Sequence, residues 1–389
     1  MISASGGPAA ETPPVAPEFM TSPVRVALIG LGDAGLTLHL PALAGLPSAS
    51  VVCALDPDAR RRQQAAQAFH VPVADSYDRL LESAPDVVIV ASPPDTHADY
   101  TLRALAHGAH VFCEKPFVSS LDQADAIIAA AATYGRQVAV NHEFRHMPVF
   151  RSVIDGIAQD GTLRFVQVWQ MMDLPPWAEP GWRGEMLQRT LYEAGVHLVD
   201  LVIAMFGQCP LAVSAVTSSC EAIDRQSDAV AIVTLEFAGG RLAQIVQNRL
   251  CKGERQYLEV RADTASSSWR ASFGGRARVL AGLFRSKRPQ IRFEYGLAGM
   301  AWREQGHTRH FVARNPSEPT VHATRENLRQ SFAAFASGGR PPTTAQDARD
   351  VHEVIAACYH AAAVGRRVVL GSNELQPLTG WRLGVAPPA

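Results

Sequence analysis

The stretch VRVALIGLGDAG, residues 24–35, decides the fold of the first part of this 389-residue chain. An apolar run, Val24–Ile29, leads directly into the spacing Gly-x-Gly-x-x-Gly, and a helical pattern begins there. Gly30 would permit a tight turn, Gly32 would let a pyrophosphate approach the main chain, and Gly35 would let the helix pack on the strand. Free N–H groups and a partial positive charge at the start of that helix would face the phosphates. The pattern therefore predicts a dinucleotide site.

Short β-branched runs alternate with helical stretches from Val24 to about residue 146. The predicted strands are Val24–Ile29, Val51–Leu55, Asp86–Ala91, His110–Cys113 and Gln137–Val140. The predicted helices between them include Pro57–Phe69, His97–Ala106 and Leu121–Thr133. Apolar strands that are separated by helices are typical of a parallel sheet covered on both faces. We therefore expect an α/β fold, with a doubly wound Rossmann domain that binds NAD over residues 24–146.

The pattern then changes to that of an α+β domain with an open, mainly antiparallel sheet. The predicted strands are Leu163–Gln170, Val213–Cys220, Ala229–Phe237, Leu242–Leu250 and Tyr257–Ala262. The predicted helices are Pro148–Ile157, Leu191–Phe206, Arg325–Ala336 and Ala345–Val364. We expect this second domain to span residues 147–389, and the family resemblance described below implies that it binds the substrate and forms the contacts between subunits.

The composition excludes several classes of protein. With 36 basic and 37 acidic side chains, the net charge of −1 gives no electrostatic reason to bind nucleic acid or an anionic membrane. No apolar run approaches the roughly 18 residues that a membrane-spanning helix needs. The six cysteines show no Cys-x-x-Cys spacing, so we expect buried, reduced thiols and no metal site. Residues 1–23 contain no Lys or Arg and are rich in Pro, Ala, Gly and Ser, which predicts a disordered leader on a cytoplasmic protein. Alternatively, the residues before Met20 lie upstream of a start at that methionine.

An acidic residue follows the second predicted strand. Asp56 stands where a carboxylate can accept hydrogen bonds from both hydroxyls of an adenosine ribose. It could instead cap a helix that begins at Pro57, and the two roles can coexist. The same carboxylate would repel a 2′-phosphate, so we expect NAD as the cofactor and NADP to be disfavoured. Three arginines, residues 60–62, could clamp such a phosphate, but we favour a solvated helix face with Arg61 near the adenine.

A lysine stands at the carboxyl end of a buried strand, where open α/β sheets bind their ligands. The stretch HVFCEKP, residues 110–116, places Glu114 and Lys115 there. Only three of the 36 basic residues are lysines, so Lys115 indicates a need for a compact ammonium group. An ordinary surface lysine at a strand end is the alternative.

A second group of candidate residues lies in a predicted helix. Glu193 and His197 are four residues apart and would share one helical face, with Asp200 about one turn later. A carboxylate beside a histidine raises its basicity and sets its tautomer, as a general acid or base requires. A buried structural histidine is the ordinary alternative. The spacing also suits a metal, but no further ligand stands nearby in the sequence.

Six motifs together carry a resemblance to a known family. They are GLGDAG at residues 30–35, Asp56, ASPPDTH at 91–97, EKP at 114–116, Arg145 with Pro148, and GVHLVD at 195–200. In this order they resemble the Gfo/Idh/MocA oxidoreductases over about residues 24–370. The resemblance implies that Lys115 is the active-site lysine and His197 the general acid or base, with Glu193 where the family usually has Asp. The implied NAD-binding residues are Gly30, Gly32, Asp33, Ala34, Gly35, Asp56, Arg61, Ser92, His97, Glu114 and Lys115.

The resemblance also implies a reaction. Hydride would pass between NAD and a secondary alcohol of a sugar or cyclitol; His197, oriented by Glu193, would take the hydroxyl proton while Lys115 stabilises the oxygen. The expected substrate contacts are His142, Arg145, Trp182 and Arg183, with Trp177 as a further stacking surface. The family's Gly-Gly-Gly run before the acid is replaced by LQRT, residues 187–190, which bears on substrate geometry. A redox-neutral glycosidase or lyase of the same family and a non-catalytic ligand sensor stay open as alternatives.

Two expectations concern the surface of the second domain. Strands 229–237 and 242–250 carry apolar residues on both faces, as a sheet buried on both sides would. Since the resemblance implies that another subunit covers such a sheet, we expect a homodimer or homotetramer. An arginine-rich stretch, residues 276–292, could be an amphipathic segment or an anionic-partner site, with an exposed excursion of the domain as the default.

Overall fold

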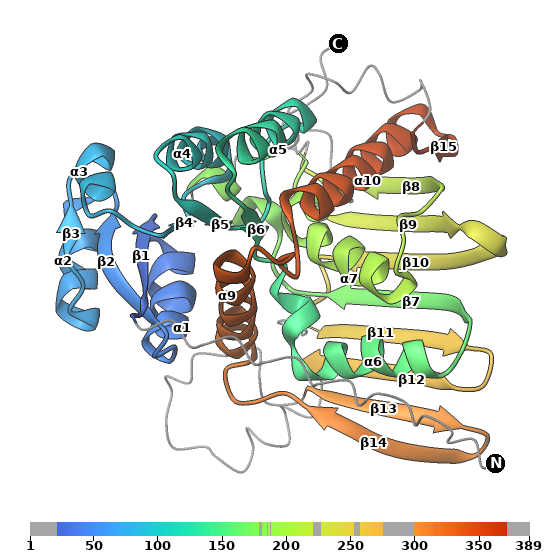
Figure 1. Cartoon of the computed structure of the whole chain (residues 1–389). Coiled ribbons are helices and arrows are strands. Elements are labelled where there is room, and N and C mark those ends of the chain that lie inside the picture. The colour runs from blue at the N-terminus through green and yellow to red at the C-terminus, as the bar shows by residue number, and fades with distance from the viewer. Residues whose placement is uncertain are drawn as a thin grey trace, which may run out of the picture.

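Two β-sheets, with helices packed against them, make up the molecule (Figure 1). The computed structural model describes residues 22–178, 181–184, 186, 188–220, 227–252, 257–274 and 299–371. The arginine-rich stretch, residues 276–292, lies outside the described residues, as does nearly all of the predicted leader. The predicted fold class is confirmed: a doubly wound parallel sheet is followed by an open, mainly antiparallel sheet.

The first sheet is parallel throughout, and its strand order is β3-β2-β1-β4-β5-β6. The strands are β1 (Val24–Ile29), β2 (Ala49–Leu55), β3 (Val73–Ala74), β4 (Val87–Val90), β5 (His110–Cys113) and β6 (Val138–Val140). The helices are η1 (Gly35–His39, π-helical), α1 (Leu40–Ala44), α2 (Ala59–Phe69), α3 (Tyr77–Glu82), α4 (Pro94–Ala106) and α5 (Leu121–Tyr134). One face packs against α4 and α5, and the other packs against α1 and α2. The carboxyl ends of the strands therefore meet at one edge, which carries the candidate site.

Among the described residues, the second sheet has nine strands in the order β14-β13-β12-β11-β7-β10-β9-β8-β15, and of these pairs only β7–β10 is parallel. The strands are β7 (Leu163–Met171), β8 (Ala212–Ser218), β9 (Val230–Phe237), β10 (Arg241–Asn248), β11 (Tyr257–Thr264), β12 (Ser268–Gly274), β13 (Met300–Gln305), β14 (Thr308–Arg314) and β15 (Val368–Val369). The helices are α6 (Pro148–Gln159), α7 (Val196–Phe206), α9 (Pro319–Ser337) and α10 (Ala345–Val364), with the short helical turns η2 (Glu143–His146) and η5 (Thr190–Gly195, π-helical). In Figure 1, α6, α7 and α10 lie across one face of the sheet.

Helix α9 returns from the second domain to the first and lies between the two sheets (Figure 1). The Arg325 side chain donates to the carbonyl oxygens of Ala42 and Pro41 within α1, at 3.1 and 3.2 Å. Just before α10, the Thr343 carbonyl accepts a hydrogen bond from Val140 N–H of β6, at 2.9 Å. The two domains are therefore joined by packing and hydrogen bonds as well as by the chain.

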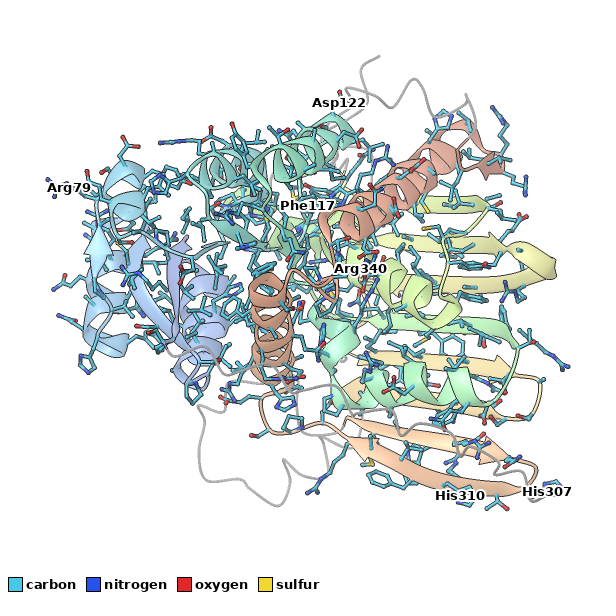
Figure 2. The ribbon with its side chains drawn as sticks, in the orientation of Figure 1. Arg79, Phe117, Asp122, His307, His310 and Arg340 are labelled. Atoms are coloured by element: carbon cyan, nitrogen blue, oxygen red, sulfur yellow. The ribbon has the colours of Figure 1, made fainter. Side chains whose placement is uncertain are left out.

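Several predicted boundaries and elements are corrected by the structure. Helix α2 begins at Ala59 because Asp58 caps it, so the predicted start at Pro57 is wrong. Strands β3, β12, β13 and β14 were not predicted. Strand β3 has only two residues, and β14 is exposed along most of its length and shows no buried apolar face. His307 and His310 mark this outer hairpin in Figure 2. Two of the six free cysteines, Cys209 and Cys220, are exposed rather than buried. No helix in the described ranges combines the length and hydropathy that crossing a membrane requires.

Candidate active site

The three glycines of the loop after β1 have distinct environments. Gly30 has a φ of +92°, which favours glycine, and a Cβ there would lie 2.5 Å from the carbonyl carbon of Ala91. A Cβ on Gly35 would lie 2.1 Å from the Gly30 oxygen, so helix and strand pack too closely for a side chain. A Cβ on Gly32 would meet only the Arg61 side chain, at 3.9 Å. The main chain at Gly32 is therefore open, and this cradle fits a pyrophosphate.

Asp33 and Ala34 form the mouth of this loop. Asp33 is exposed and Ala34 is half-buried, so both lie at the surface of the cradle. The carbonyl of Asp33 accepts a hydrogen bond from the Thr37 hydroxyl at 2.6 Å, which fastens the loop to the first helical turn.

The carboxylate of Asp56 holds the glycine-rich loop. Its Oδ2 accepts the Leu31 N–H and its Oδ1 accepts the Asp58 N–H, both at 2.8 Å. The alternative that Asp56 caps helix α2 is wrong, because Asp58 fills that position. Arg61 Nη1 lies 3.6 Å from Asp56 Oδ2, and its side chain is 52% exposed. Asp56 and Arg61 thus stand together beside the cradle at Gly32.

His97 lies beneath the site and not at its surface. The ring is fully buried, with Nε2 2.7 Å from the Ser92 carbonyl oxygen and Nδ1 3.0 Å from the carbonyl oxygens of Pro116 and Phe117. Burial lowers the pKa of His97, so the ring is neutral. The ring therefore lies between the loop after β4 and the turn that carries Lys115, and its contact with the cofactor stays a prediction. The half-buried Ser92, whose Oγ lies 2.6 Å from Thr96 Oγ1, stays at the edge of the site.

Glu114 links the glycine-rich segment to the strand ends. Its Oε1 accepts hydrogen bonds from His39 Nε2 and Asn141 Nδ2, each at 2.7 Å, and its Oε2 accepts the Lys115 N–H at 3.1 Å. Burial alone would raise the pKa of Glu114, but these hydrogen bonds and the Lys115 charge lower it to about 2. Glu114 is therefore an anion that positions three segments of the site.

Glu193 lies among cations. Its carboxylate is 3.4 Å from Arg183 Nε, 3.6 Å from Arg189 Nε and 3.3 Å from Arg249 Nη1. Lys115 Nζ donates to the Glu193 main-chain oxygen at 3.3 Å. Burial would raise the pKa of Glu193, but the charges of Lys115 and the arginines lower it to about 2.

His197 is buried and packed on an aromatic ring. It stacks on Phe144 with ring centroids 4.3 Å apart, and its Nδ1 lies 3.6 Å from Glu143 Oε2. Burial, together with the charges of Lys115 and His142, lowers the pKa of His197 well below its usual value. A neutral imidazole at this position can accept a proton.

The expected pair between Glu193 and His197 is not formed. The spacing of four residues suggested one, but the Glu193 carboxylate pairs instead with Arg183 and Arg189, which precede it, and with Arg249, which follows β10. The acid that lies beside His197 is Glu143, which sequence reasoning missed. Burial and the Glu114 charge raise the pKa of Glu143 to about 8. One signal could have found it, because Glu143 follows the carboxyl end of β6 by three residues.

The predicted substrate contacts differ in how far they are buried. Arg145 forms a two-pronged ion pair with buried Asp200, with Nε–Oδ2 and Nη2–Oδ1 distances of 2.6 Å. His142 is fully buried, and neither of its ring nitrogens has a hydrogen-bond partner within the described segments. The Arg183 guanidinium lies 4.4 Å from the Trp182 ring. The side chain of Trp177 lies outside what the structure describes.

Metal ligands do not gather at this site. Across the ranges that the structure describes, no group of three or more His, Cys, Asp or Glu side chains could hold a metal ion. The arrangement instead places the Lys115 ammonium at the end of β5, where it donates to the main-chain oxygen of Glu193, four residues before the neutral His197. The glycine cradle lies at the end of β1 in the same sheet. Such a set can hold a dinucleotide and move a proton at a substrate oxygen.

Comparison with known proteins extends this result. Residues 24–142 match the oxidoreductase family model with an NAD-binding Rossmann fold, and residues 159–268 match the GFO/IDH/MocA C-terminal domain. D-glucoside 3-dehydrogenase of Escherichia coli K12 is 28% identical over 194 residues, which is 48% of this chain and 55% of that protein. The dTDP-3,4-didehydro-2,6-dideoxy-alpha-D-glucose 3-reductase of Actinomadura kijaniata is 33% identical over 135 residues, 34% of this chain and 41% of that protein. The matched segments thus span about half the length of these curated relatives.

Solved structures agree on the fold. The crystal structure of GenD2 from gentamicin A biosynthesis, in complex with NAD, has a TM-score of 0.73 and 24% identity, and the match covers 93% of this chain and all of that one. Since the two family models together cover more than half of the residues, the chain belongs to the Gfo/Idh/MocA family of oxidoreductases, and its first domain is the NAD-binding Rossmann domain of that family.

Proposed function

We infer that the protein transfers hydride between NAD and a secondary alcohol of a sugar or a related polyol. The observation that carries this proposal is the placement of Lys115 and His197 together at the carboxyl edge of the NAD-binding sheet. Lys115 Nζ donates to the main-chain oxygen of Glu193, four residues before His197, and burial together with the Lys115 charge lowers the pKa of His197. Two groups held in this way can act on one substrate oxygen. The names of the relatives, a glucoside dehydrogenase and a deoxysugar reductase, support a sugar as the substrate.

The residues that would hold the cofactor are those around the glycine cradle. Gly32 offers its open main chain to the pyrophosphate, and Asp56 and Arg61 stand where the adenosine end would lie. Bound NAD supplies the hydride acceptor for oxidation of the alcohol.

His197 and Lys115 divide the proton chemistry between them. Because Nδ1 of His197 faces Glu143, Nε2 is the nitrogen left for the substrate. In oxidation, Nε2 accepts the hydroxyl proton, while the Lys115 ammonium stabilises the negative charge that develops on the same oxygen. In reduction, the protonated nitrogen returns that proton to the carbonyl oxygen.

The test begins with the purified full-length protein. Mass spectrometry should find retained nucleotide or, after addition, bound NAD, and a panel of sugars, glycosides and cyclitols should give a change in absorbance at 340 nm. Lys115→Met and His197→Asn should each lower turnover at least ~10²-fold, the usual scale for lost acid–base help, without a matching loss of NAD affinity.

Two outcomes would overturn the proposal. A His197→Asn variant with near-normal turnover would make the ring structural. Elimination or hydrolysis of a glycoside without net reduction of NAD would indicate the redox-neutral chemistry instead.

A further inference from the structure

A second short helical turn contributes both a stacking surface and an acid to His197. Glu143 and Phe144 are adjacent in η2, directly after β6. Phe144 stacks on the imidazole at 4.3 Å and thereby limits rotation of the ring. Glu143, which is only 5% exposed, brings Oε2 to 3.6 Å from His197 Nδ1. One segment therefore sets both the plane of the ring and the group that its inner nitrogen faces.

Both atoms of this pair are free to bond to each other. Within the described part of the chain, neither Glu143 Oε2 nor His197 Nδ1 has a hydrogen-bond partner, and both are buried. A distance of 3.6 Å exceeds a formed hydrogen bond, so an approach of about 0.5 Å would complete one. A buried polar atom without a hydrogen-bond partner destabilises the folded state, which favours that approach.

The acid that the helical spacing suggested cannot take this role. Three arginines surround the carboxylate of Glu193, and Lys115 donates to its main-chain oxygen. Turning Glu193 toward His197 would break these ion pairs. Glu143 has no such competing partner for its Oε2 among the described residues.

We propose that Glu143, and not Glu193, is the positioning residue of His197, and that it sets which ring nitrogen carries the proton. The effects on kinetics depend on the proposed function, whereas the contact between Glu143 and His197 does not.

The proton count of the pair would then select the direction of catalysis. When one proton lies between the two side chains, there are two possible arrangements. Either the Glu143 carboxyl group donates to Nδ1 of a neutral ring, or the Glu143 carboxylate accepts from Nδ1–H of a protonated ring. In both arrangements Nε2 bears a hydrogen. The site can then act only as an acid, as carbonyl reduction requires. When that proton is lost, the Glu143 carboxylate accepts the Nδ1–H and Nε2 presents a free lone pair. The site can then act as the base for alcohol oxidation.

The charged groups around the pair place this change in an accessible pH range. Burial and the negative charges of Glu114 and Asp200 raise the pKa of Glu143, the Lys115 ammonium opposes them, and the result is about 8. Lys115 and the neighbouring His142 also disfavour a second proton on His197. Oxidation should therefore increase as the pH rises through about 8, and reduction should decline.

A readout that does not need turnover tests the pair directly. The ring ¹⁵N shifts of His197, assigned by comparison with His197→Asn, should report movement of the proton from Nε2 to Nδ1 between pH 7 and pH 9. Glu143→Gln should abolish this change, because an amide does not titrate. Glu143→Asp, which keeps the acid one methylene shorter, should restore a titration in part.

Kinetics supply the second readout, with a matched control. In Glu143→Gln the acidic limb of the oxidation profile should move at least one pH unit lower, and the rate at pH 9 should fall roughly tenfold, a modest loss for acid–base help. Glu193→Gln makes the same chemical change at the acid held by arginines. It should leave the position of the limb unchanged, whatever its effect on the rate.

The outcomes separate this inference from the proposed function. A His197 titration that is unchanged in Glu143→Gln, or lost in Glu193→Gln, would overturn the assignment of Glu143. If instead the wild-type ring titrates as expected but no sugar or polyol is oxidised, the proposed function fails and the positioning role stands.

Discussion

Asp56 performs a structural task that limits how the site can treat a phosphate. Its two oxygens accept main-chain hydrogen bonds from Leu31 and Asp58, so the carboxylate is held in place before any ligand arrives. The half-exposed Arg61 guanidinium lies 3.6 Å away and offsets the charge of Asp56 only in part. A 2′-phosphate would meet a rigid anion.

The first prediction follows from that rigid anion. NAD should bind at least ~10-fold more tightly than NADP, since each 1.4 kcal/mol of repulsion is a factor of ten. Asp56→Asn keeps one oxygen that can accept a main-chain hydrogen bond from the loop, and it removes the negative charge. It should therefore reduce the ratio of NAD affinity to NADP affinity, chiefly by improving NADP binding. Fluorescence titration with both dinucleotides measures this. Tighter NADP binding by the unmutated protein would refute the prediction and assign the arginines at 60–62 to the phosphate.

Glu143 should make the folded protein sensitive to alkaline pH. Its pKa is 4.5 when solvated and about 8 in the fold, so the folded state holds an extra proton between these values. Stability should therefore fall as the pH rises from about 4.5 to about 8, by roughly 5 kcal/mol at most. Glu143→Gln carries no such penalty: it should melt near the wild type at pH 5 and several degrees higher at pH 9.

Glu193 is the control for this prediction, because the fold lowers its pKa whereas it raises the pKa of Glu143. The pKa of Glu193 is lowered to about 2, so its stabilising contribution is present above pH 4.5 and is lost only as the pH falls toward 2. Glu193→Gln should therefore melt below the wild type at both pH 5 and pH 9. Thermal melts of the wild type, Glu143→Gln and Glu193→Gln in matched buffers test both expectations. If the melting temperatures of Glu143→Gln and the wild type differ by the same amount at pH 5 and pH 9, the prediction for Glu143 is wrong.

Single residues also show where sequence reasoning reached its limit. Lys115 and His197 could be singled out because each belongs to a recognisable motif at a strand or helix end. Glu143 and His39 could not, since their partners, His197 and Glu114, are 54 and 75 positions away and become neighbours only in the fold. Spacing on one helix paired Glu193 with His197, but it could not include Arg249, which follows β10 and reaches Glu193 only in the fold.

At the scale of elements, the loop after β1 contains glycines that the fold requires and a glycine that only ligand binding would require. Gly35 and Gly30 have no room for a methyl group, whereas Gly32 has open space in front of it. Gly32→Ala should therefore fold with a melting temperature close to that of the wild type and bind NAD at least ~10-fold more weakly, because the methyl group occupies the pyrophosphate cradle.

Gly35→Ala is the matched comparison for this loop. The same added methyl group would lie 2.1 Å from the Gly30 oxygen, so this variant should lose stability, or fail to fold, before NAD affinity can be compared. Calorimetric measurement of the melting temperature and of NAD affinity, for Gly32→Ala and Gly35→Ala, tests this comparison. Unchanged NAD affinity in Gly32→Ala would show that the cradle is not where the pyrophosphate binds.

Elements were predicted best where burial leaves a pattern in the sequence. The apolar strands of the first sheet and the alternating strands β9 and β10 were identified from the sequence because each has at least one fully buried face. Strand β14 was missed, since nearly all of its residues are exposed and its Arg and His side chains resemble those of a loop. The helix at 191–206 was expected as one α-helix, but it begins with the π-helical turn η5, which tertiary contacts and not local spacing determine.

At the scale of the whole molecule, the second sheet carries apolar side chains on the face opposite its helices. Val216, Ile232, Val246 and Trp169 occupy successive paired positions on β8, β9, β10 and β7. Val216 is 66% exposed and Ile232 is 45% exposed, so this row is not fully covered within one chain. A row of this kind across four strands suits association with another flat apolar surface.

The prediction for assembly follows from that row. Light scattering at micromolar concentration should give the mass of a homodimer or homotetramer, and Ile232→Lys should lower the mass to that of a folded monomer, since a buried unpaired charge at an interface is costly. Val73→Lys, at a position 41% exposed on the other sheet, should leave the mass unchanged. A wild-type protein that is monomeric at this concentration would contradict the prediction.

Helix α9 has a consequence for how the molecule is made. The ribosome produces the NAD-binding segment first, yet Leu328 and Phe332 of α9 belong to the core under its sheet, and Ala348 of α10 belongs to the core on the other face. That core therefore stays incomplete until synthesis has passed residue 348 and those residues have left the exit tunnel. The NAD-binding domain thus emerges before the second domain, but its core is completed only by residues of α9 and α10.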